Sequence, residues 1–312
     1  RKVALFCNVA PEAVIQSIDV PSIYEVPLKM QQQKLDEIVL TKTGMLVGST
    51  PELKPWKEFL ARVKNAKESV RIGLVGKYVE LQDAYKSIDE ALFQAATYND
   101  RKLDLQLIHS EKLNESNVEE LLGSMDGLLI APGFGQRGIE GKFTAIKYAR
   151  EHDVPTFGIC LGMQCMVIEF ARNVLGYADA NSTEMEVSTK HNVIDLMESQ
   201  KSVSNMGGTM RLGEYDCVLD PDSKTAKAYQ STHIKERHRH RFEFNSDYRA
   251  EFEAAGMKCV GENPETHLVE VVEIPSLSWF IGVQYHPEYN STVLRPNPLF
   301  IDFIKAVIKN KK

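Results

Sequence analysis

The stretch that decides the fold is Gly158-Ile159-Cys160-Leu161-Gly162, because it joins two segments of different periodicity. Residues 154–157 are short and apolar, as expected of a buried strand, and apolar residues recur at helical spacing over 163–172. A cysteine between two glycines at such a junction is the cysteine form of a nucleophile elbow. The following helix N-terminus favours a thiolate there. Glycine-flanked cysteines also occur as packing residues, so the rest of the chain has to decide between catalysis and packing.

From residue 70 onward, segments of strand length alternate with segments of helical length. We expect strands over residues 70–75, 103–108 and 127–131, and helices over 83–98, 116–122 and 140–151. Repeated units of this kind predict an α/β fold with a largely parallel central sheet flanked by helices. Ligands of such sheets gather beyond the carboxyl ends of the strands, where Cys160 and the loop Pro132-Gly133-Phe134-Gly135 are expected to lie. This coincidence favours catalysis.

The two ends of the chain have a different character. We expect a polar loop over 195–208, strands over 210–219, 268–274 and 279–283, and a last helix over 299–308. Near the N-terminus we expect a strand over 2–7 and an extended piece over 23–27. Residues 1–50 carry too few apolar residues to cover a sheet, and residues 51–69 hold one apolar helical face. We therefore predict three parts: a piece that packs on something outside this chain (1–50), a connecting helix (51–69) and the main domain (70–312).

Composition excludes several classes of protein. The 312 residues carry a net charge of −6, which argues against a general nucleic-acid or membrane-surface binder. No apolar run approaches the roughly 20 residues that a membrane-spanning helix needs. Five scattered cysteines form no disulfide framework and no C-x-x-C metal pair. We expect a cytoplasmic protein that binds neither nucleic acid nor membrane and holds no metal.

A base for the predicted nucleophile follows the apolar segment 279–283. His286 and Glu288 alternate across Pro287, and alternate residues of an extended chain point the same way. The carboxylate can then accept a hydrogen bond from the imidazole and hold it in one orientation. A thiolate nucleophile needs such an oriented base, so we predict a triad of Cys160, His286 and Glu288.

Attack on a carbonyl also requires hydrogen-bond donors for the developing oxyanion. The backbone amides of Gly133 and of Leu161, the residue after the nucleophile, are the natural pair. In the alternative interpretation, the glycines of the 132–135 loop only allow a tight turn. A phosphate-binding loop is rejected, because its lysine and spacing are missing.

These motifs resemble class I (triad) glutamine amidotransferases, which hydrolyse the side-chain amide of glutamine. The resemblance rests on Gly158-Ile159-Cys160-Leu161-Gly162-Met163-Gln164, His286-Pro287-Glu288 and the Gly133 loop. Several further stretches resemble the glutaminase half of the CTP synthase family: Val75-Gly76-Lys77-Tyr78, Asp83-Ala84-Tyr85-Lys86-Ser87, Asn181-Ser182-Thr183-Glu184, Gly207-Gly208-Thr209-Met210-Arg211-Leu212-Gly213 and Glu236-Arg237-His238-Arg239-His240-Arg241-Phe242-Glu243. The resemblance covers roughly residues 70–305, and residues 1–50 resemble the end of that family's synthetase domain and its linker.

The resemblance implies roles for four further residues. Glu184 would pair with the α-ammonium of L-glutamine and Arg241 with its α-carboxylate. Gln164 would hydrogen-bond the substrate, and Phe134 would wall the pocket. Without the resemblance, residues 235–241 would be interpreted as a solvated basic face or a phosphate patch. One departure is Pro132, which stands where many members have a glycine and which cannot donate a hydrogen bond.

The resemblance also implies a larger reaction. The ammonia would pass to a synthetase domain of the same polypeptide, where ATP with Mg²⁺ activates UTP for amination to CTP. Glutamine hydrolysis itself would need no cofactor. GTP would act as an activator, with Arg211 in a lid as the candidate contact, and the full-length enzyme would form a homotetramer.

Three alternatives remain. The chain could serve another synthetase or be a γ-glutamyl hydrolase, but neither accounts for the stretches 207–213 and 236–242. It could also be a catalytically silent, glutaminase-like binding module, although no member of the triad is missing. A nucleic-acid binder built on the basic run is poorly supported by the acidic total charge.

Overall fold

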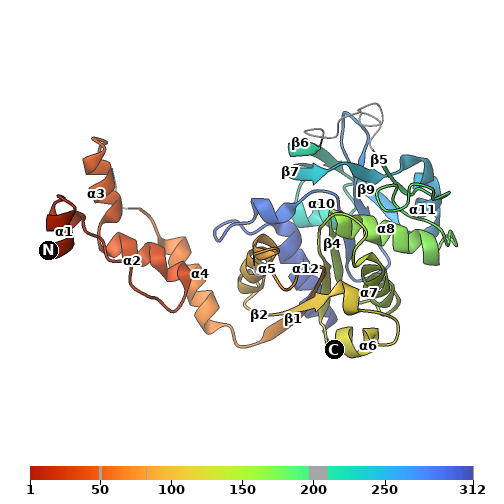
Figure 1. Cartoon of the computed structure of the whole chain (residues 1–312), viewed down its shortest axis with the longest axis horizontal. Coiled ribbons are helices and arrows are strands. Elements are labelled where there is room, and N and C mark those ends of the chain that lie inside the picture. The colour runs from red at the N-terminus through yellow and green to blue at the C-terminus, as the bar shows by residue number, and fades with distance from the viewer. Residues whose placement is uncertain (49–50, 82, 197–209, 312) are drawn as a thin grey trace. The chain divides into compact units, whose positions relative to one another are not determined.

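The computed structural model describes residues 1–48, 51–81, 83–196 and 210–311. These residues divide into two compact units, Arg1–Asn65 and Ala66–Lys312 (Figure 1). Within the described ranges, no helix is long and apolar enough to cross a membrane. Part of the predicted polar loop, residues 197–208, lies outside the described residues, as do Gly207, Gly208 and Thr209 of the 207–213 motif.

The first unit is helical. Its helices are α1 (Lys2–Phe6), α2 (Val26–Gln32), α3 (Leu35–Lys42) and α4 (Lys54–Asn65). The prediction of a strand over 2–7 is wrong, and so is that of an extended piece over 23–27, because residues 23–25 form a 3₁₀ helix that leads into α2. A segment without a neighbouring strand satisfies its backbone hydrogen bonds within itself, as a helix does.

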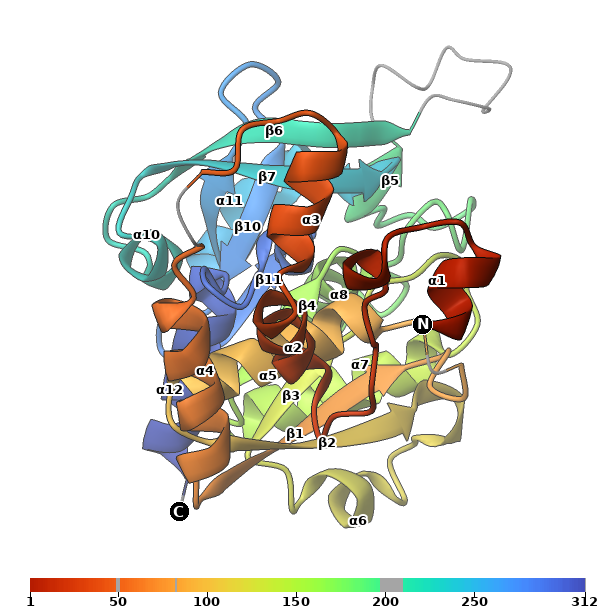
Figure 2. The ribbon, with the colours of Figure 1, turned by 90° about the vertical axis from the view of Figure 1, so that its left-hand side faces the viewer.

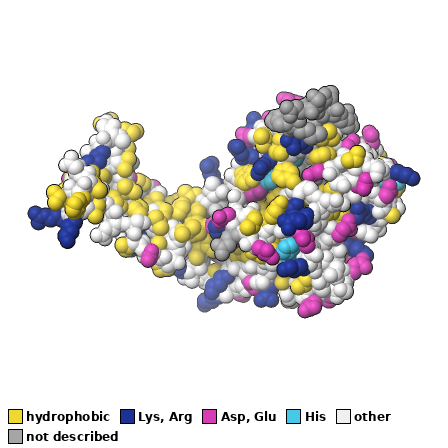
Figure 3. Space-filling view, in the orientation of Figure 1, with side chains coloured by type: hydrophobic (Ala, Val, Ile, Leu, Met, Phe, Trp, Pro, Cys, Tyr) yellow, Lys and Arg dark blue, Asp and Glu magenta, His cyan; other side chains and the backbone are white. Residues whose placement is uncertain are grey.

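Aromatic side chains hold this unit together. Tyr24 lies against Phe59 of α4 with ring centroids 5.3 Å apart, and the indole of Trp56 donates a hydrogen bond to the Tyr24 carbonyl over 2.6 Å. Much of the remaining apolar surface is uncovered, as the yellow patches on this unit show (Figure 3). Leu5, Phe6 and Leu46 are more than three-quarters exposed.

In its described residues, the second unit is built on one nine-stranded sheet, of which five strands are parallel. In spatial order these are β2 (Lys102–His109), β1 (Ser69–Gly76), β3 (Gly127–Ile130), β4 (Thr156–Ile159) and β11 (Phe280–Val283). β3 and β4 are buried along their whole length, as expected of central parallel strands. The predicted α/β fold with a largely parallel centre is confirmed.

Helices cover both faces of the parallel strands (Figures 1 and 2). α5 (Lys86–Tyr98) and α12 (Pro298–Asn310) pack against each other on one face, and α7 (Ile139–Glu151) and α8 (Leu161–Asn173) do so on the other. The short α6 (Val118–Leu122) contacts α7. Each face therefore has its own apolar core, and the strand ends between them are free to carry polar groups.

Four antiparallel strands extend the sheet beyond β11. They are β10 (Val269–Glu273), β9 (Lys258–Glu262), β6 (Arg211–Leu219) and β7 (His233–His240). The predicted neighbouring pair 268–274 and 279–283 is the antiparallel pair β10–β11. Further elements of this unit are α10 (Lys224–Tyr229), α11 (Arg249–Ala255) and a small ladder of β5 (Ile194–Leu196) and β8 (Phe242–Phe244).

Candidate active site

Cys160 occupies a strained turn between β4 and α8. Its backbone has φ +52° and ψ −108°, a conformation that a side chain with a Cβ adopts only at a cost. The flanking glycines allow the close packing: a Cβ on Gly158 would lie 2.4 Å from the Met166 sulfur, and one on Gly162 would lie 2.1 Å from the Ile130 carbonyl oxygen. The sequence pattern and the turn geometry therefore agree.

His286 and Glu288 come to the same edge of the sheet because β11 pairs with β4. His286 follows β11, and its Nδ1 lies 2.8 Å from Oε1 of Glu288, which sits in the 3₁₀ turn Pro287–Asn290. The His286 amide donates to the Arg237 carbonyl over 2.8 Å. Both side chains are buried, so the pair is held away from bulk water.

The proton affinity of His286 depends on its neighbours. Burial alone lowers the pKa of the imidazole, but the Cys160 sulfur and the Glu288 carboxylate outweigh burial and raise this pKa to about 11. At neutral pH the ring is therefore protonated and faces the sulfur as a cation. A protonated imidazole at this position is placed to donate a proton to a leaving group.

A small pocket opens beside the sulfur. Six of the residues singled out from the sequence line it: Gly133, Phe134, Cys160, Gln164, Glu184 and Arg241. His240 and Phe242, which lie in the 236–243 motif but received no role from the sequence, complete the lining. Leu161 lies at the first position of α8 and is buried.

Two buried lysines hold the Gly133 loop. Lys142 of α7 donates from Nζ to the Ala131 carbonyl over 2.5 Å, and Lys77, after β1, donates from Nζ to the Phe134 carbonyl. Burial lowers the pKa of Lys142. Sequence reasoning missed Lys142, because a lysine among apolar helical residues is normally assigned to the exposed face.

One carboxylate side chain, Glu184, and one amide side chain, Gln164, line the pocket. Oε1 of Glu184 accepts a hydrogen bond from the Gly135 amide over 2.9 Å. Gln164 donates from Nε2 to the Phe242 carbonyl over 2.9 Å and to Oε1 of Gln284 over 3.1 Å. The pocket therefore has fixed polar groups before any ligand enters it.

Arg211 does not lie at this pocket and is not presented to solvent. Its Nη2 donates to Oε1 of the fully buried Glu270 over 2.7 Å, and its guanidinium stacks over Tyr215. His238 lies 2.8 Å from the other oxygen of Glu270. This placement gives no support to the prediction that Arg211 contacts a nucleotide from a lid.

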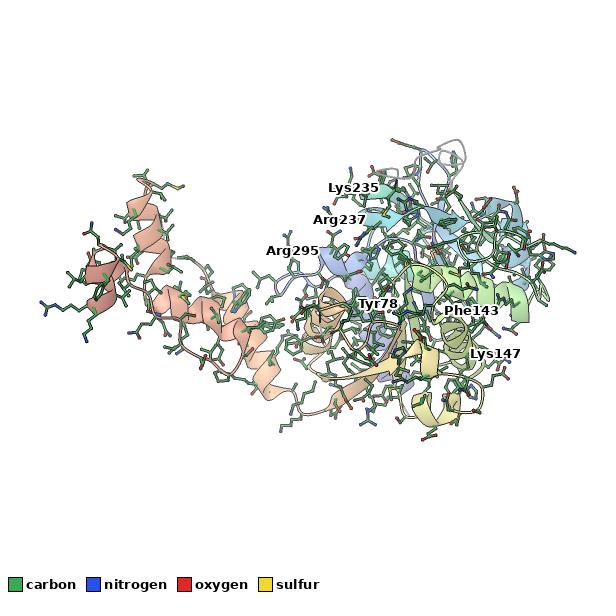
Figure 4. All side chains as sticks on the ribbon, viewed as in Figure 1. Tyr78, Phe143, Lys147, Lys235, Arg237 and Arg295 are labelled. Carbon is green, nitrogen blue, oxygen red and sulfur yellow. The ribbon has the colours of Figure 1, made fainter. Side chains whose placement is uncertain are left out.

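The basic run 235–241 has two faces. Its alternate residues Lys235 and Arg237 are exposed and project outward from β7 (Figure 4). The other face of β7 carries Glu236, His238 and His240, which are buried. Sequence reasoning missed this buried face, because period-two alternation of charged with charged residues gives no hydrophobic signal.

Glu236 is the hub of the buried polar groups behind the candidate triad. Its carboxylate accepts hydrogen bonds from the Tyr229 hydroxyl over 2.6 Å, from Asn290 over 2.7 Å and from Asn297 over 2.9 Å. Burial raises the pKa of Glu236 to about 6 despite these donors. Because Asn290 ends the turn that carries Glu288, the hub ties this turn to β7, α10 and the start of α12.

Comparison with known proteins decides the family. The model of the family "Glutamine amidotransferase class-I" matches residues 80–306, and that of "CTP synthase N-terminus" matches residues 1–45. The chain belongs to the class I glutamine amidotransferase family. Among the described residues of this amidotransferase, no group of three or more His, Cys, Asp or Glu side chains is arranged to hold a metal ion.

Individual relatives show which amidotransferases the chain is similar to. The amidotransferase is 68% identical over 308 residues to a CTP synthase of Bacteroides fragilis and 66% identical over 312 residues to one of Porphyromonas gingivalis. The alignments cover 99% and 100% of this chain but 58% of each relative, so the chain spans less than two thirds of their length. A solved glutaminase domain of Trypanosoma brucei CTPS with bound acivicin superimposes with a TM-score of 0.73 at 36% identity, over 78% of this chain and 96% of that one.

Proposed function

We propose that this amidotransferase hydrolyses L-glutamine to glutamate and ammonia through a thioester on Cys160. The observation that carries the proposal is the sulfur at a strained elbow beside the buried His286–Glu288 pair, with the pocket opening on it. The thiolate attacks the side-chain amide carbon, and His286 donates its proton to the departing ammonia. His286 then takes a proton from water, and the resulting hydroxide cleaves the thioester.

The pocket lining supports the choice of glutamine. Glu184 supplies a carboxylate for the α-ammonium and Arg241 a planar guanidinium for the α-carboxylate, so the two charges of an amino acid have partners of opposite sign. Gln164 offers an amide to the substrate, and Phe134 supplies an apolar wall. This pattern favours glutamine over a silent binding module, because every group that the chemistry needs is present.

The oxyanion of the tetrahedral intermediate would be held by the backbone amides of Gly133 and Leu161. The anchored carbonyls on both sides of Gly133 support this role, because Lys142 holds Ala131 and Lys77 holds Phe134. Such preorganised donors typically contribute on the order of 10²–10³ in rate. Pro132 has no amide hydrogen, so it adds no second donor beside Gly133.

Within a longer polypeptide, the ammonia would serve the amination of UTP to CTP at a synthetase domain that uses ATP and Mg²⁺. The similarity to CTP synthases and the match of residues 1–45 to their N-terminal part support this assignment. Residues 1–50 would then be the end of that domain, 51–69 the connecting helix and 70–312 the glutaminase domain. By the same similarity, GTP would activate the enzyme, the full-length protein would be a cytoplasmic homotetramer, and glutamine hydrolysis would need no cofactor.

The test is intact mass after incubation with a diazo-ketone analogue of glutamine. We expect one adduct on the wild type, none on Cys160→Ala, and suppression by excess glutamine. Cys165→Ala is the matched control, because Cys165 is buried one turn further along α8. It is expected to retain the adduct. An adduct on any other residue would contradict the proposal.

A further inference from the structure

The mechanism above leaves one buried polar side chain at the sulfur without a role. Gln284 follows β11, two residues before His286, and its side chain is almost fully buried. Its Nε2 lies 3.6 Å from Sγ of Cys160, within hydrogen-bond distance for a sulfur acceptor. Its backbone amide donates to the Glu270 carbonyl over 2.8 Å, which anchors the residue to β10.

The neighbouring groups determine which end of the Gln284 amide faces the sulfur. The Phe242 carbonyl can only accept, so the group of Gln164 that lies 2.9 Å from it has to be the NH₂. The same NH₂ lies 3.1 Å from the Gln284 side chain, where it requires an oxygen. The Gln284 NH₂ is therefore left to face Cys160. The side-chain amides of Gln164 and Gln284 therefore form a row that begins at the Phe242 carbonyl and ends with an NH₂ directed at the Cys160 sulfur.

We infer that Gln284 is a further catalytic residue, which stabilises negative charge on the Cys160 sulfur. The inference rests on the proposed function, because the charge matters most when the thioester is hydrolysed. In that step water forms a bond to the glutamyl carbon and gives a proton to His286. The carbon–sulfur bond then breaks and leaves its electron pair on Sγ, where Gln284 donates a hydrogen bond to the departing thiolate.

The inferred hydrogen bond is stronger to a thiolate than to the sulfur of a thioester, because hydrogen bonds to charged groups are roughly twice as strong as those between neutral groups. It therefore favours the free thiolate before attack and favours its release afterwards. Gln164 contributes indirectly, since its NH₂ orients the Gln284 amide. A substitution of Gln284 is expected to affect both the thiolate population and the lifetime of the thioester.

The first test needs no substrate. Cys160 is alkylated with iodoacetamide over a range of pH, and its modification is followed by peptide mass spectrometry, so that the exposed Cys7 does not interfere. For Gln284→Met we expect the midpoint of the profile to move up by about one pH unit. Gln284→Glu keeps the length and a polar group but replaces the donor with a carboxylate, so its shift is expected to be at least as large. Gln106→Met, the same change at an exposed site on β2, is expected to leave the profile unchanged.

The second test uses glutamine. During turnover, we expect Gln284→Met to accumulate the glutamyl adduct on Cys160, several-fold above the wild type by intact mass. Circular dichroism identifies the variants that fold. If Gln284→Met does not fold, both tests are made with Gln284→Glu. If the alkylation profiles of the folded variants match the wild type, the inference is overturned while the proposed function stands. If the wild type hydrolyses no glutamine, the proposed function fails, and the alkylation profile still decides whether Gln284 stabilises the thiolate.

Discussion

The two halves of the nine-stranded sheet bring groups to the candidate site in different ways. In the parallel half, β3 and β4 are buried and mostly apolar, and the backbone positions the candidate catalytic groups, because the elbow at Cys160 and the Gly133 loop both follow strand ends. In the antiparallel half, β7 buries charged and imidazole side chains on one face. There the positioning comes from side-chain hydrogen bonds, such as those to Glu236.

The difference shows that one sheet can position a site by two kinds of interaction with different sensitivities. Where the backbone positions the site, a larger side chain destabilises the fold, because protein interiors are close-packed. Where buried charged side chains position the site, removing the partner of one of them destabilises the fold, because an unpaired buried charge is costly. Substitutions in the two halves are therefore expected to fail for different reasons.

The largest effect on activity is expected at His286, which follows β11, the strand where the parallel and antiparallel halves of the sheet meet. His286→Ala removes the proton donor and acceptor that β11 brings to the sulfur, and we expect glutamine hydrolysis to fall about 10²–10⁴-fold. The measurement is the initial rate of ammonia release. His191→Ala, at a half-exposed histidine stacked on Tyr177, is the control and is expected to keep the wild-type rate. A His286→Ala rate within tenfold of the wild type would contradict the triad.

The next effect tests the buried charges of the antiparallel half. Arg211→Met leaves the buried Glu270 without its cation, and we expect the free energy of unfolding to fall by about 3–5 kcal/mol. Arg71→Met breaks a comparable but exposed pair with Asp104, and we expect a loss of about 0–1 kcal/mol. Urea unfolding measures both. Equal losses would show that burial is not what makes the antiparallel half sensitive.

A smaller effect is expected from added volume in the parallel half. In Gly162→Ala, the new methyl group meets the Ile130 carbonyl oxygen at the turn, and we expect a loss of about 3 kcal/mol together with lower activity. Gly176→Ala is the matched control, because its φ is +80° but nothing lies near the added carbon. It is expected to lose only about 1 kcal/mol, from backbone strain alone. Similar losses in both variants would argue against the close packing at the elbow.

The smallest effect is the pH dependence of the unfolding free energy that arises from Glu236, the hub of the antiparallel half. The pKa of Glu236 is about 6 in the folded protein, above its ordinary value of 4.5, so folding takes up a proton between these values. Its contribution to stability is fully present below about pH 4.5 and is lost as the pH rises through about 6. Between pH 4.5 and 7, we expect the difference in unfolding free energy between wild type and Glu236→Gln to fall by about 2 kcal/mol.

Urea unfolding at several pH values measures this difference. Glu236→Gln also replaces an acceptor with an NH₂ that faces donors on Tyr229, Asn290 or Asn297, so the variant is expected to be less stable at every pH. A difference that stays constant with pH would show that Glu236 does not titrate in this range.

The sequence by itself determined the parallel half and singled out Cys160 as the candidate nucleophile. Short apolar segments followed by amphipathic ones can form little except strand–helix units, and a glycine-flanked cysteine at their junction is recognisable from neighbouring residues alone. His286 and Glu288 were predictable for the same reason, since two residues of separation suffice to place them side by side. The prediction of a strand over residues 2–7 was wrong, because these apolar residues pair with no strand among the described residues and form α1.

Only the tertiary structure decided which polar residues are buried. Lys142, Glu236, Arg211 and Gln284 are among residue types that mostly lie at the surface, and no local pattern distinguishes them from exposed residues of the same type. Each is buried because partners from other elements of the fold compensate for its lost hydration, as the Ala131 carbonyl does for Lys142 and Glu270 does for Arg211. The cost of burying a polar group depends on its partners, and those partners meet only when the sheet has formed.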